Sequence, residues 1–279
     1  MEGQYHSILG LPRSGKTTFL AALWHLIAAG EVTTKLVLDK LVGNSTYLDL
    51  VVDAWRRCEE VPRTSMGAEE NIAIHVHEPI ANRKIVLGFP DLSGESFERQ
   101  FAARACKPEY VEGYSGEGGI VLFVNADRGS DGMTMLDLGP AVAGEAPPEQ
   151  TVPEEWSAKC VPEQVRLVDL LQFLLVPPFS RRCRRLAVVI SAWDVLPEPK
   201  VQPFEWLARE MPLLDQFLKN NPDSFEVRTY GVSAQGGKVT GDAKTRLIKL
   251  SPSERIQCVG PHAGPHDLTA SLVWLSGGD

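Results

Sequence analysis

Hydrophobic and polar positions follow two periodicities along the chain. Short apolar runs bounded by glycine, proline or charged residues predict strands at 5–9, 71–76, 84–89, 119–124, 186–190 and 225–232. Apolar residues three and four positions apart predict helices at 16–29, 45–58, 165–175, 204–218 and 267–275, the last capped by Asp267. The runs at 119–124 and 186–190 are rich in β-branched residues and do not alternate, which indicates burial on both faces of a parallel sheet.

The order of these elements predicts a fold class. Strands alternate with helices, so right-handed crossovers should build an α/β fold of three layers around a mostly parallel, doubly wound sheet. The strands 71–76 and 84–89 are joined by a turn-rich segment, which predicts one antiparallel hairpin at the sheet edge. We expect a single domain over 1–279, with insertions at about 30–66, 128–162 and 236–265.

Composition and charge narrow the classes of function. The chain has 279 residues, 43% of them hydrophobic, and a net charge of −8, so no global positive field would attract nucleic acid or an anionic membrane. It contains no apolar run long enough to span a membrane, and its start lacks the features of a signal peptide, which together predict a cytoplasmic protein. The five cysteines are scattered without zinc-site spacing, and we expect His75 and His77 to lie on a strand face and bind no metal.

The strongest chemical signal is a glycine-rich loop between the first strand and the first helix. Residues 10–17 read Gly-Leu-Pro-Arg-Ser-Gly-Lys-Thr and match the Walker A pattern. Loop amides and a helix N-terminus would direct positive dipole at phosphate oxygens, Lys16 would add a full charge, and the Thr17 hydroxyl would bind Mg²⁺. The predicted nucleotide-binding residues of this loop are Gly10, Arg13, Ser14, Gly15, Lys16, Thr17 and Thr18.

Three further motifs follow predicted strands. Asp91 and Gly94, in the pattern Asp-x-x-Gly, come directly after the strand 84–89, where the carboxylate could hold a Mg²⁺-bound water and the Gly94 amide could bond a γ-phosphate. Asp194 follows the strand 186–190, and Ser233 with Ala234 follows the strand 225–232. All three motifs should therefore meet at the carboxyl edge of the sheet.

With these motifs the chain resembles Ras-like and translation-factor P-loop GTPases. Within that class it resembles the bacterial double-GTPase families of conflict and defence gene clusters, through the large insertion before the first switch, the Pro-x-Thr at 62–64, Asp91-x-x-Gly94-Glu95 and the closing run 268–275. The resemblance implies that Asp194 accepts hydrogen bonds from guanine N1 and N2, that the Ala234 amide donates to O6, and that GTP or GDP binds with Mg²⁺. That class writes Asn/Thr-Lys-x-Asp, whereas Ser191 and Ala192 occupy the first two places here, so an adenine-binding or permissive site stays open.

The resemblance also implies catalytic roles and partners. Thr64 stands where the first switch presents a threonine to Mg²⁺, with Ser65 as the neighbouring choice, and Glu95 stands where a glutamine orients the attacking water. Arg63 is the predicted arginine finger, with Arg13 as the alternative. We expect slow intrinsic turnover raised by a protein partner, an activator or effector encoded nearby.

Two other functions remain open on sequence grounds. One is a P-loop kinase or ATPase, although no second basic lid segment of the kind such kinases use is present. The other is a non-hydrolysing nucleotide-binding scaffold, in which the arginine-rich run 181–185 could dock an acidic partner. A comparison of GTP with ATP binding distinguishes the first alternative, and phosphate release distinguishes the second.

Overall fold

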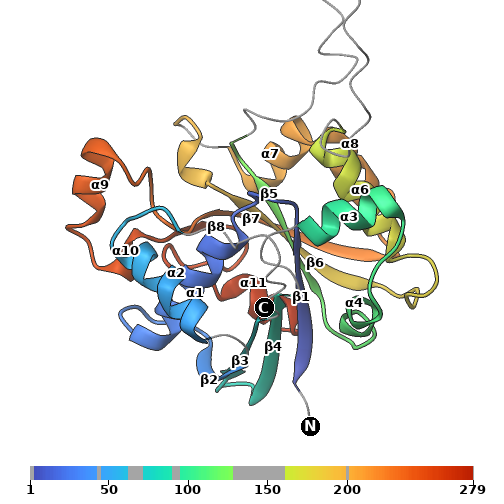
Figure 1. The fold of residues 1–279 in the computed structure, drawn as a ribbon, viewed down its shortest axis with the longest axis horizontal. Coiled ribbons are helices and arrows are strands. Elements are labelled where there is room, and N and C mark those ends of the chain that lie inside the picture. The colour runs from blue at the N-terminus through green and yellow to red at the C-terminus, as the bar shows by residue number, and fades with distance from the viewer. Residues whose placement is uncertain are drawn as a thin grey trace, which may run out of the picture.

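An eight-stranded sheet forms the centre of the protein (Figure 1). The computed structural model describes residues 3–42, 45–61, 72–89, 95–127, 161–198 and 201–278. The strands are β1 Gln4–Gly10, β2 Val37–Val42, β3 Ile72–Glu78, β4 Arg83–Phe89, β5 Ile120–Asn125, β6 Arg184–Ser191, β7 Phe225–Ser233 and β8 Gln257–Val259. Their order in space is β2-β3-β4-β1-β5-β6-β7-β8. Because β1 lies in the middle, the loop that follows it opens at the centre of the sheet edge.

Strand directions agree with the predicted α/β class. The five strands β4, β1, β5, β6 and β7 run parallel to one another, and β3 and β4 form the predicted antiparallel hairpin. Two strands that the sequence did not predict extend the sheet, β2 beside β3 and β8 beside β7, both antiparallel. The parallel centre puts the carboxyl ends of β1, β5, β6 and β7 on one edge, which is where ligands bind in sheets of this kind.

Strand β2 escaped prediction for a physical reason. Its sequence, Val-Leu-Asp-Lys-Leu-Val, does not alternate between apolar and polar residues. In the structure the register against β3 shifts between Leu38 and Lys40, so that Asp39 is an extra residue in the ladder. A bulge of this kind restores Leu38 and Leu41 to the same, partly buried side of the sheet.

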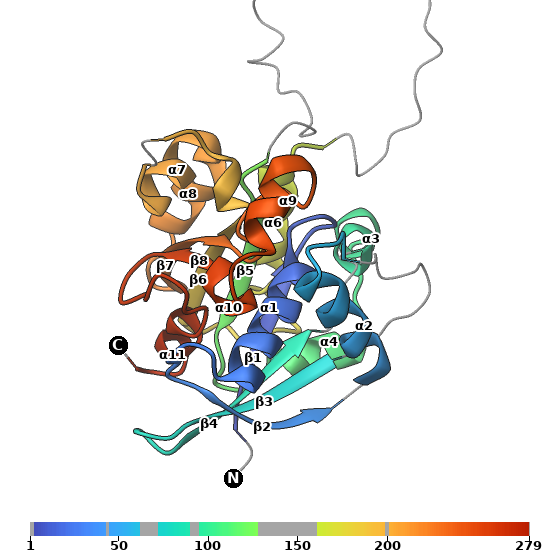
Figure 2. The same cartoon turned by 90° about the vertical axis from the view of Figure 1, so that its left-hand side faces the viewer.

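Helices cover both faces of the sheet and complete the three layers (Figures 1 and 2). One apolar core forms between the sheet and α1, α2 and α11, and a second between the sheet and α3, α4, α6, α7 and α8. Along β5, Val121 and Phe123 face the first core, while Ile120, Leu122 and Val124 face the second. The bounds are α1 Lys16–Ala29, α2 Ser45–Arg56, α3 Glu95–Ala103, α4 Pro108–Gly113, α6 Glu163–Phe173, α7 Pro203–Glu210, α8 Pro212–Lys219, α9 Gly241–Leu247, α10 Pro252–Arg255 and α11 Ala270–Leu275.

One predicted helix is divided and the expected insertions contain regular structure. The predicted helix 204–218 is the pair α7 and α8, because Pro212 cannot continue α7 and forces Met211 out of helical geometry, with φ −131° and ψ 57°. The segment 30–66 holds β2 and α2. The segment 236–265, expected to be irregular, holds α9, α10 and β8, whereas 128–160 lies outside the described residues.

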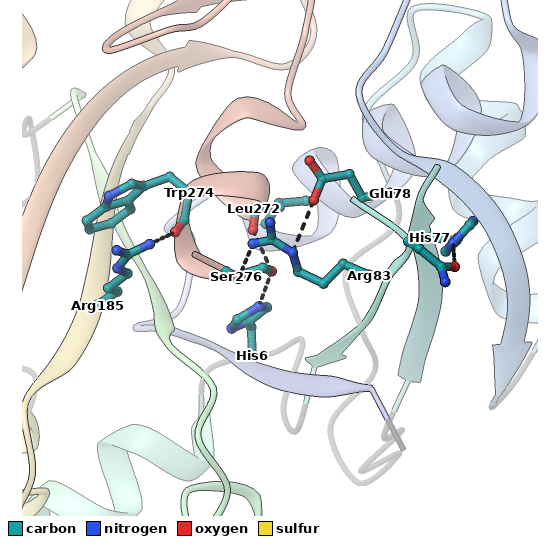
Figure 3. Close-up of polar contacts among 9 residues, drawn as sticks. His6, His77, Glu78, Arg83, Arg185, Leu272, Trp274 and Ser276 are labelled. Carbon is teal, nitrogen blue, oxygen red and sulfur yellow. Dashed lines mark hydrogen bonds and ion pairs between the residues drawn. The ribbon is translucent and has the colours of Figure 1, made fainter. Parts of the chain in front are cut away.

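The closing helix α11 packs at the amino-terminal end of the strands (Figure 3). It begins at Ala270, three residues later than predicted, and Asp267 accepts the Thr269 N–H at 2.7 Å in the turn before it. Carbonyl groups at its C-terminal end accept hydrogen bonds from Arg185, at 2.6 Å from the Trp274 oxygen, and from Arg83 at Ser276. Cations near the C-terminus of a helix interact favourably with the negative end of its dipole, so these arginines help to hold α11 against the sheet. Among the helices of the described ranges, none is long and apolar enough to cross a membrane.

Candidate nucleotide-binding site

The glycine-rich loop lies between β1 and α1, as the sequence predicts. Lys16 is 2% exposed and its ammonium group donates to the Gly10 carbonyl at 2.7 Å and the Leu11 carbonyl at 3.0 Å. The Ser14 hydroxyl lies 3.3 Å from the same nitrogen. These contacts hold the charge of Lys16 against the inner side of the loop, close to the helix N-terminus that follows.

Two residues of the loop adopt left-handed backbone conformations. Gly15, at φ 89°, ends the loop directly before α1, and Arg13 has φ 63°. A β-carbon on Gly15 would lie 2.7 Å from the Ser191 β-carbon, and one on Gly10 would lie 2.9 Å from the Phe123 β-carbon. Both glycines are therefore required by close packing against the neighbouring strands, and Gly15 also by its conformation.

Asn125 fastens the loop to the neighbouring strand. It is the last residue of β5, and its side-chain amide donates to the Arg13 carbonyl at 2.9 Å. Its carbonyl oxygen accepts the Asp127 N–H at 2.9 Å, which fixes the orientation of the amide. Sequence reasoning missed Asn125, although a polar residue at the carboxyl end of a buried strand was a usable signal.

Asp194 and Ser233 meet at the ends of β6 and β7. Ala192 has a left-handed conformation, with φ 53°, that turns the chain out of β6. The following Trp193 is 1% exposed and packs so closely on Gly231 that no β-carbon would fit there. The Ser233 hydroxyl donates to Asp194 Oδ1 at 2.5 Å and accepts the Gly236 N–H at 3.0 Å. The Ser233 hydroxyl thus orients Asp194 through one of its two carboxylate oxygens.

A cavity of about 580 Å³ joins the glycine-rich loop to these residues. This volume is in the range of small-molecule and cofactor pockets. Five of the predicted nucleotide-binding residues line it, namely Arg13, Gly15, Thr18, Asp194 and Ala234. Gly10, Ser14 and Lys16 build the loop beneath it, and buried Ser233 supports Asp194. Predicted residues that are far apart in sequence therefore surround a single space.

Other predicted residues lie elsewhere. Glu95 is the first residue of α3, half-buried, and is not among the residues that line the cavity. Thr17 is half-buried in the first turn of α1 and does not line the cavity either. Arg63, Thr64, Asp91 and Gly94 lie outside the described residues, as does Ser65.

The expected insertions supply part of the cavity wall. Glu59, Glu60 and Val61, which follow α2, line one part, and Lys238, Val239 and Thr240, which precede α9, line another. Lys238 is exposed and belongs to the same cavity as Asp194. Ala192, which stands where the Asn/Thr-Lys-x-Asp pattern has its lysine, lines this cavity too, so the cavity wall still includes a cation from a distant part of the sequence.

The arginine-rich run 181–185 has structural contacts. Arg182 donates to the Tyr114, Gly116 and Gly118 carbonyls, and burial lowers its pKa from the ordinary value. Arg184 donates to the Ser180 carbonyl at 2.7 Å and the Leu174 carbonyl at 3.3 Å. These contacts connect neighbouring loops, and they give the run a role in holding the fold.

The residues present are compatible with a Mg²⁺ ion bound together with phosphate. Within the part of the chain that the structure describes, no group of three histidine, cysteine or acidic residues is placed to hold a metal ion. Mg²⁺ typically keeps several waters and binds through one or two protein groups and substrate phosphates. Thr17, directly after the lysine of the loop, is the described residue whose hydroxyl fits that donor set.

Comparisons with solved structures found similar chains of low sequence identity. In overall structure the chain is similar to a Plasmodium falciparum protein described as nucleolar GTP-binding protein 1, with 11% identity, 89% of this chain and 87% of that chain covered, and a TM-score of 0.39. It is also similar to the GTPase-like domain of Saccharomyces cerevisiae Ski7 bound to GTP, with 13% identity, 85% and 44% covered, and a TM-score of 0.42. A third similar structure is Era in complex with MgGDPNP and ribosomal RNA, with 16% identity, 95% of this chain and 59% of that chain covered, and a TM-score of 0.33.

The chain thus spans less than two thirds of the Ski7 and Era chains. No curated protein matches it in sequence. The model of one protein family, Double-GTPase 1, matches residues 7–275, which is nearly the whole chain and includes every residue of the cavity described above. On that match, the chain belongs to the Double-GTPase 1 family.

Proposed function

We propose that this protein is a Mg²⁺-dependent switch that binds and hydrolyses GTP. The observation that carries the proposal is the single cavity that connects the glycine-rich loop after β1 with Asp194 and Ala234 after β6 and β7. The membership of the chain in the Double-GTPase 1 family supports GTP as the nucleotide. By the likeness to bacterial double-GTPases, the switch would act in a multi-protein conflict or defence-like system in the cytoplasm.

At the phosphate end, the loop supplies positive charge in a fixed arrangement. Lys16 lies at the loop carbonyls beside the N-terminus of α1, so its charge and the helix dipole act on the same phosphate oxygens. Thr17 and, from outside the described residues, Asp91 and Thr64 would hold the metal ion. A bound Mg²⁺ would supply neutralisation of the phosphate charge, and the Gly94 amide would bond the γ-phosphate.

At the base end, the arrangement favours guanine. Asp194 keeps one carboxylate oxygen free of the Ser233 contact, and a carboxylate accepts hydrogen bonds from guanine N1 and N2. The Ala234 amide would donate to O6, which adenine replaces with an amino group. Lys238 would pack its aliphatic chain and charge over the base, in place of the lysine missing from the motif.

Hydrolysis would depend on positioning of water and on charge stabilisation. Glu95, at the start of α3, would orient the attacking water at the γ-phosphate. Arg63 would stabilise the transition-state charge from the same chain. A protein partner would raise a slow intrinsic rate.

Calorimetric titration of the purified chain with GTP, GDP and ATP in Mg²⁺ tests the binding proposal. We expect GTP and GDP to bind more tightly than ATP, and Lys16→Ala to abolish triphosphate binding without changing the thermal midpoint by more than a few degrees. Arg181→Ala, in the exposed part of the arginine-rich run, is the matched loss of a cation away from the cavity. Equal binding of GTP and ATP, or unchanged binding in Lys16→Ala, would contradict the proposal.

A non-hydrolysing scaffold is the second candidate, because Glu95 is absent from the cavity lining. Phosphate release under single-turnover conditions separates the two functions. A switch should release phosphate slowly, and Glu95→Gln should reduce that rate with GTP affinity unchanged. Tight GTP binding with no phosphate release, alone or with the products of neighbouring genes, would favour the scaffold.

A further inference from the structure

Helix α2, which lies in the predicted insertion 30–66, ends against the loop that follows β7. Trp55, in its last turn, is 0% exposed, and its indole N–H donates to the Ala234 carbonyl at 2.9 Å. In the opposite direction, the Gln235 side-chain amide donates to the Trp55 carbonyl at 3.2 Å. Two reciprocal hydrogen bonds therefore join a helix and a loop that are 179 and 180 residues apart.

Arg255, at the end of α10, secures this junction from a second side. It is 3% exposed and its guanidinium group lies 5.3 Å from the centre of the Trp55 ring. It donates to the Trp55 carbonyl at 3.4 Å and to the Arg56 carbonyl at 2.8 Å, and it also contacts the Cys58 sulfur. The terminal carbonyls of α2, which have no partner within the helix, thus bond to a buried cation.

The position of this junction connects it to the nucleotide site. Ala234 lines the cavity through the same loop that Trp55 holds, and the chain that leaves α2 lines it again at Glu59, Glu60 and Val61. With its carbonyl bonded to Trp55 and its neighbour Gln235 bonded back, the backbone of Ala234 has little freedom to rotate. The Ala234 N–H belongs to the preceding peptide, so these bonds restrain its direction through the Ala234 backbone dihedral angles.

We infer that Trp55 and Arg255 are positioning residues that aim the Ala234 amide at the six-position oxygen of a guanine base. The inference rests on the proposed function and extends it to the choice of base. Trp55 and Arg255 come from the segments 30–66 and 236–265, which the sequence presented as insertions, and they restrain the loop after β7 that carries Ala234. Asp194 is oriented by the Ser233 hydroxyl and makes no hydrogen bond with Trp55 or Arg255 among the described residues. Recognition of O6 and of the N1 and N2 groups should therefore respond to different substitutions.

Nucleotides that each lack one recognised group can separate these effects. Inosine triphosphate lacks the 2-amino group and reports on Asp194, whereas 6-thioguanosine triphosphate keeps the N1 and N2 donors, lacks O6 and carries in its place a sulfur that accepts hydrogen bonds weakly, so it reports on Ala234. The affinity of the full chain for these two and for GTP would be measured in Mg²⁺ by calorimetry. We expect the wild type to prefer GTP over the O6-deficient analogue by about tenfold, the worth of a hydrogen bond in a buried site.

Trp55→Phe removes the indole N–H and keeps an aromatic ring. We expect it to reduce the preference for GTP over the O6-deficient analogue to about twofold, while the preference for GTP over inosine triphosphate stays the same. Arg255→Gln should act in the same direction, because it removes the guanidinium contacts from the opposite side of the junction. It also provides a second variant if Trp55→Phe fails to fold.

Trp274→Phe is the matched control. Trp274 is also buried, at 1% exposed, and packs in the same apolar core, but its indole N–H has no hydrogen-bond partner among the described residues. It should leave both preferences unchanged. A Trp55→Phe variant that weakens all three nucleotides equally would show a packing role and overturn the inference, whereas a wild type that binds none of them would refute the proposed function itself.

Discussion

Folding stability should depend on pH through His6, a buried residue of β1 (Figure 3). Its Nδ1 accepts the Gly119 N–H at 2.8 Å, so the ring proton must be on Nε2. Nε2 then donates to the Ser276 hydroxyl at 2.7 Å, and that hydroxyl donates to the Leu272 carbonyl at 2.9 Å. A second ring proton would face the Gly119 N–H, so the charged imidazole does not fit the folded protein.

The pKa of His6 gives the magnitude of this pH dependence. Burial lowers it from 6.5 to about 4. The unfolded chain therefore takes up the proton first, and the stability from His6 is complete above about pH 6.5 and is lost as the pH falls toward 4. At about 1.4 kcal/mol per pH unit, the full loss is about 3 kcal/mol, of which about 2 kcal/mol is lost by pH 5.

Urea unfolding of the wild type and of His6→Gln, between pH 7.5 and pH 5, measures this term. The variant keeps a neutral polar side chain, so its free energy of unfolding should fall about 2 kcal/mol less than that of the wild type over this range. His25, whose pKa is also lowered by burial, is present in both proteins and cancels in the difference. Parallel pH profiles for the two proteins would refute the reasoning, because they would mean that His6 can be protonated in the folded state.

Three further predictions concern the nucleotide site. Gly15→Ala should lower GTP affinity at least tenfold by calorimetry, because its φ of 89° costs a side chain about 1–2 kcal/mol and its methyl group would meet Ser191; affinity within twofold of the wild type would contradict this. Asn125→Ala should weaken GTP, GDP and inosine triphosphate alike, by about fivefold, since it frees the Arg13 carbonyl; a selective loss of one nucleotide would show a role in base recognition. Lys238→Ala should weaken GTP and GDP about two- to fivefold and leave pyrophosphate binding unchanged, as a contact with the base alone requires; weakened pyrophosphate binding would place the lysine at the phosphates.

The sequence alone determined the glycine-rich loop between β1 and α1 and the core of the sheet. Both depend on local patterns: a glycine loop followed by lysine, and apolar runs long enough to be buried on two faces. Helix α1 begins and ends where its periodicity predicts, because Gly15 and Gly30 both adopt left-handed conformations at its ends. The hairpin β3–β4 was predictable for the same reason, since its alternation and its turn are adjacent in the chain.

Tertiary structure decided the features that join distant segments. The bulge that lets β2 pair with β3 depends on a partner strand that begins 30 residues after it ends, so the pattern within β2 could not indicate it. Three such features arise where strand ends and loops converge: the contact of Asn125 with the glycine-rich loop, the contact of Trp55 with Ala234, and the place of Lys238 in the cavity. Periodicity reports which side of an element is buried, but it carries no information on which distant group that side meets.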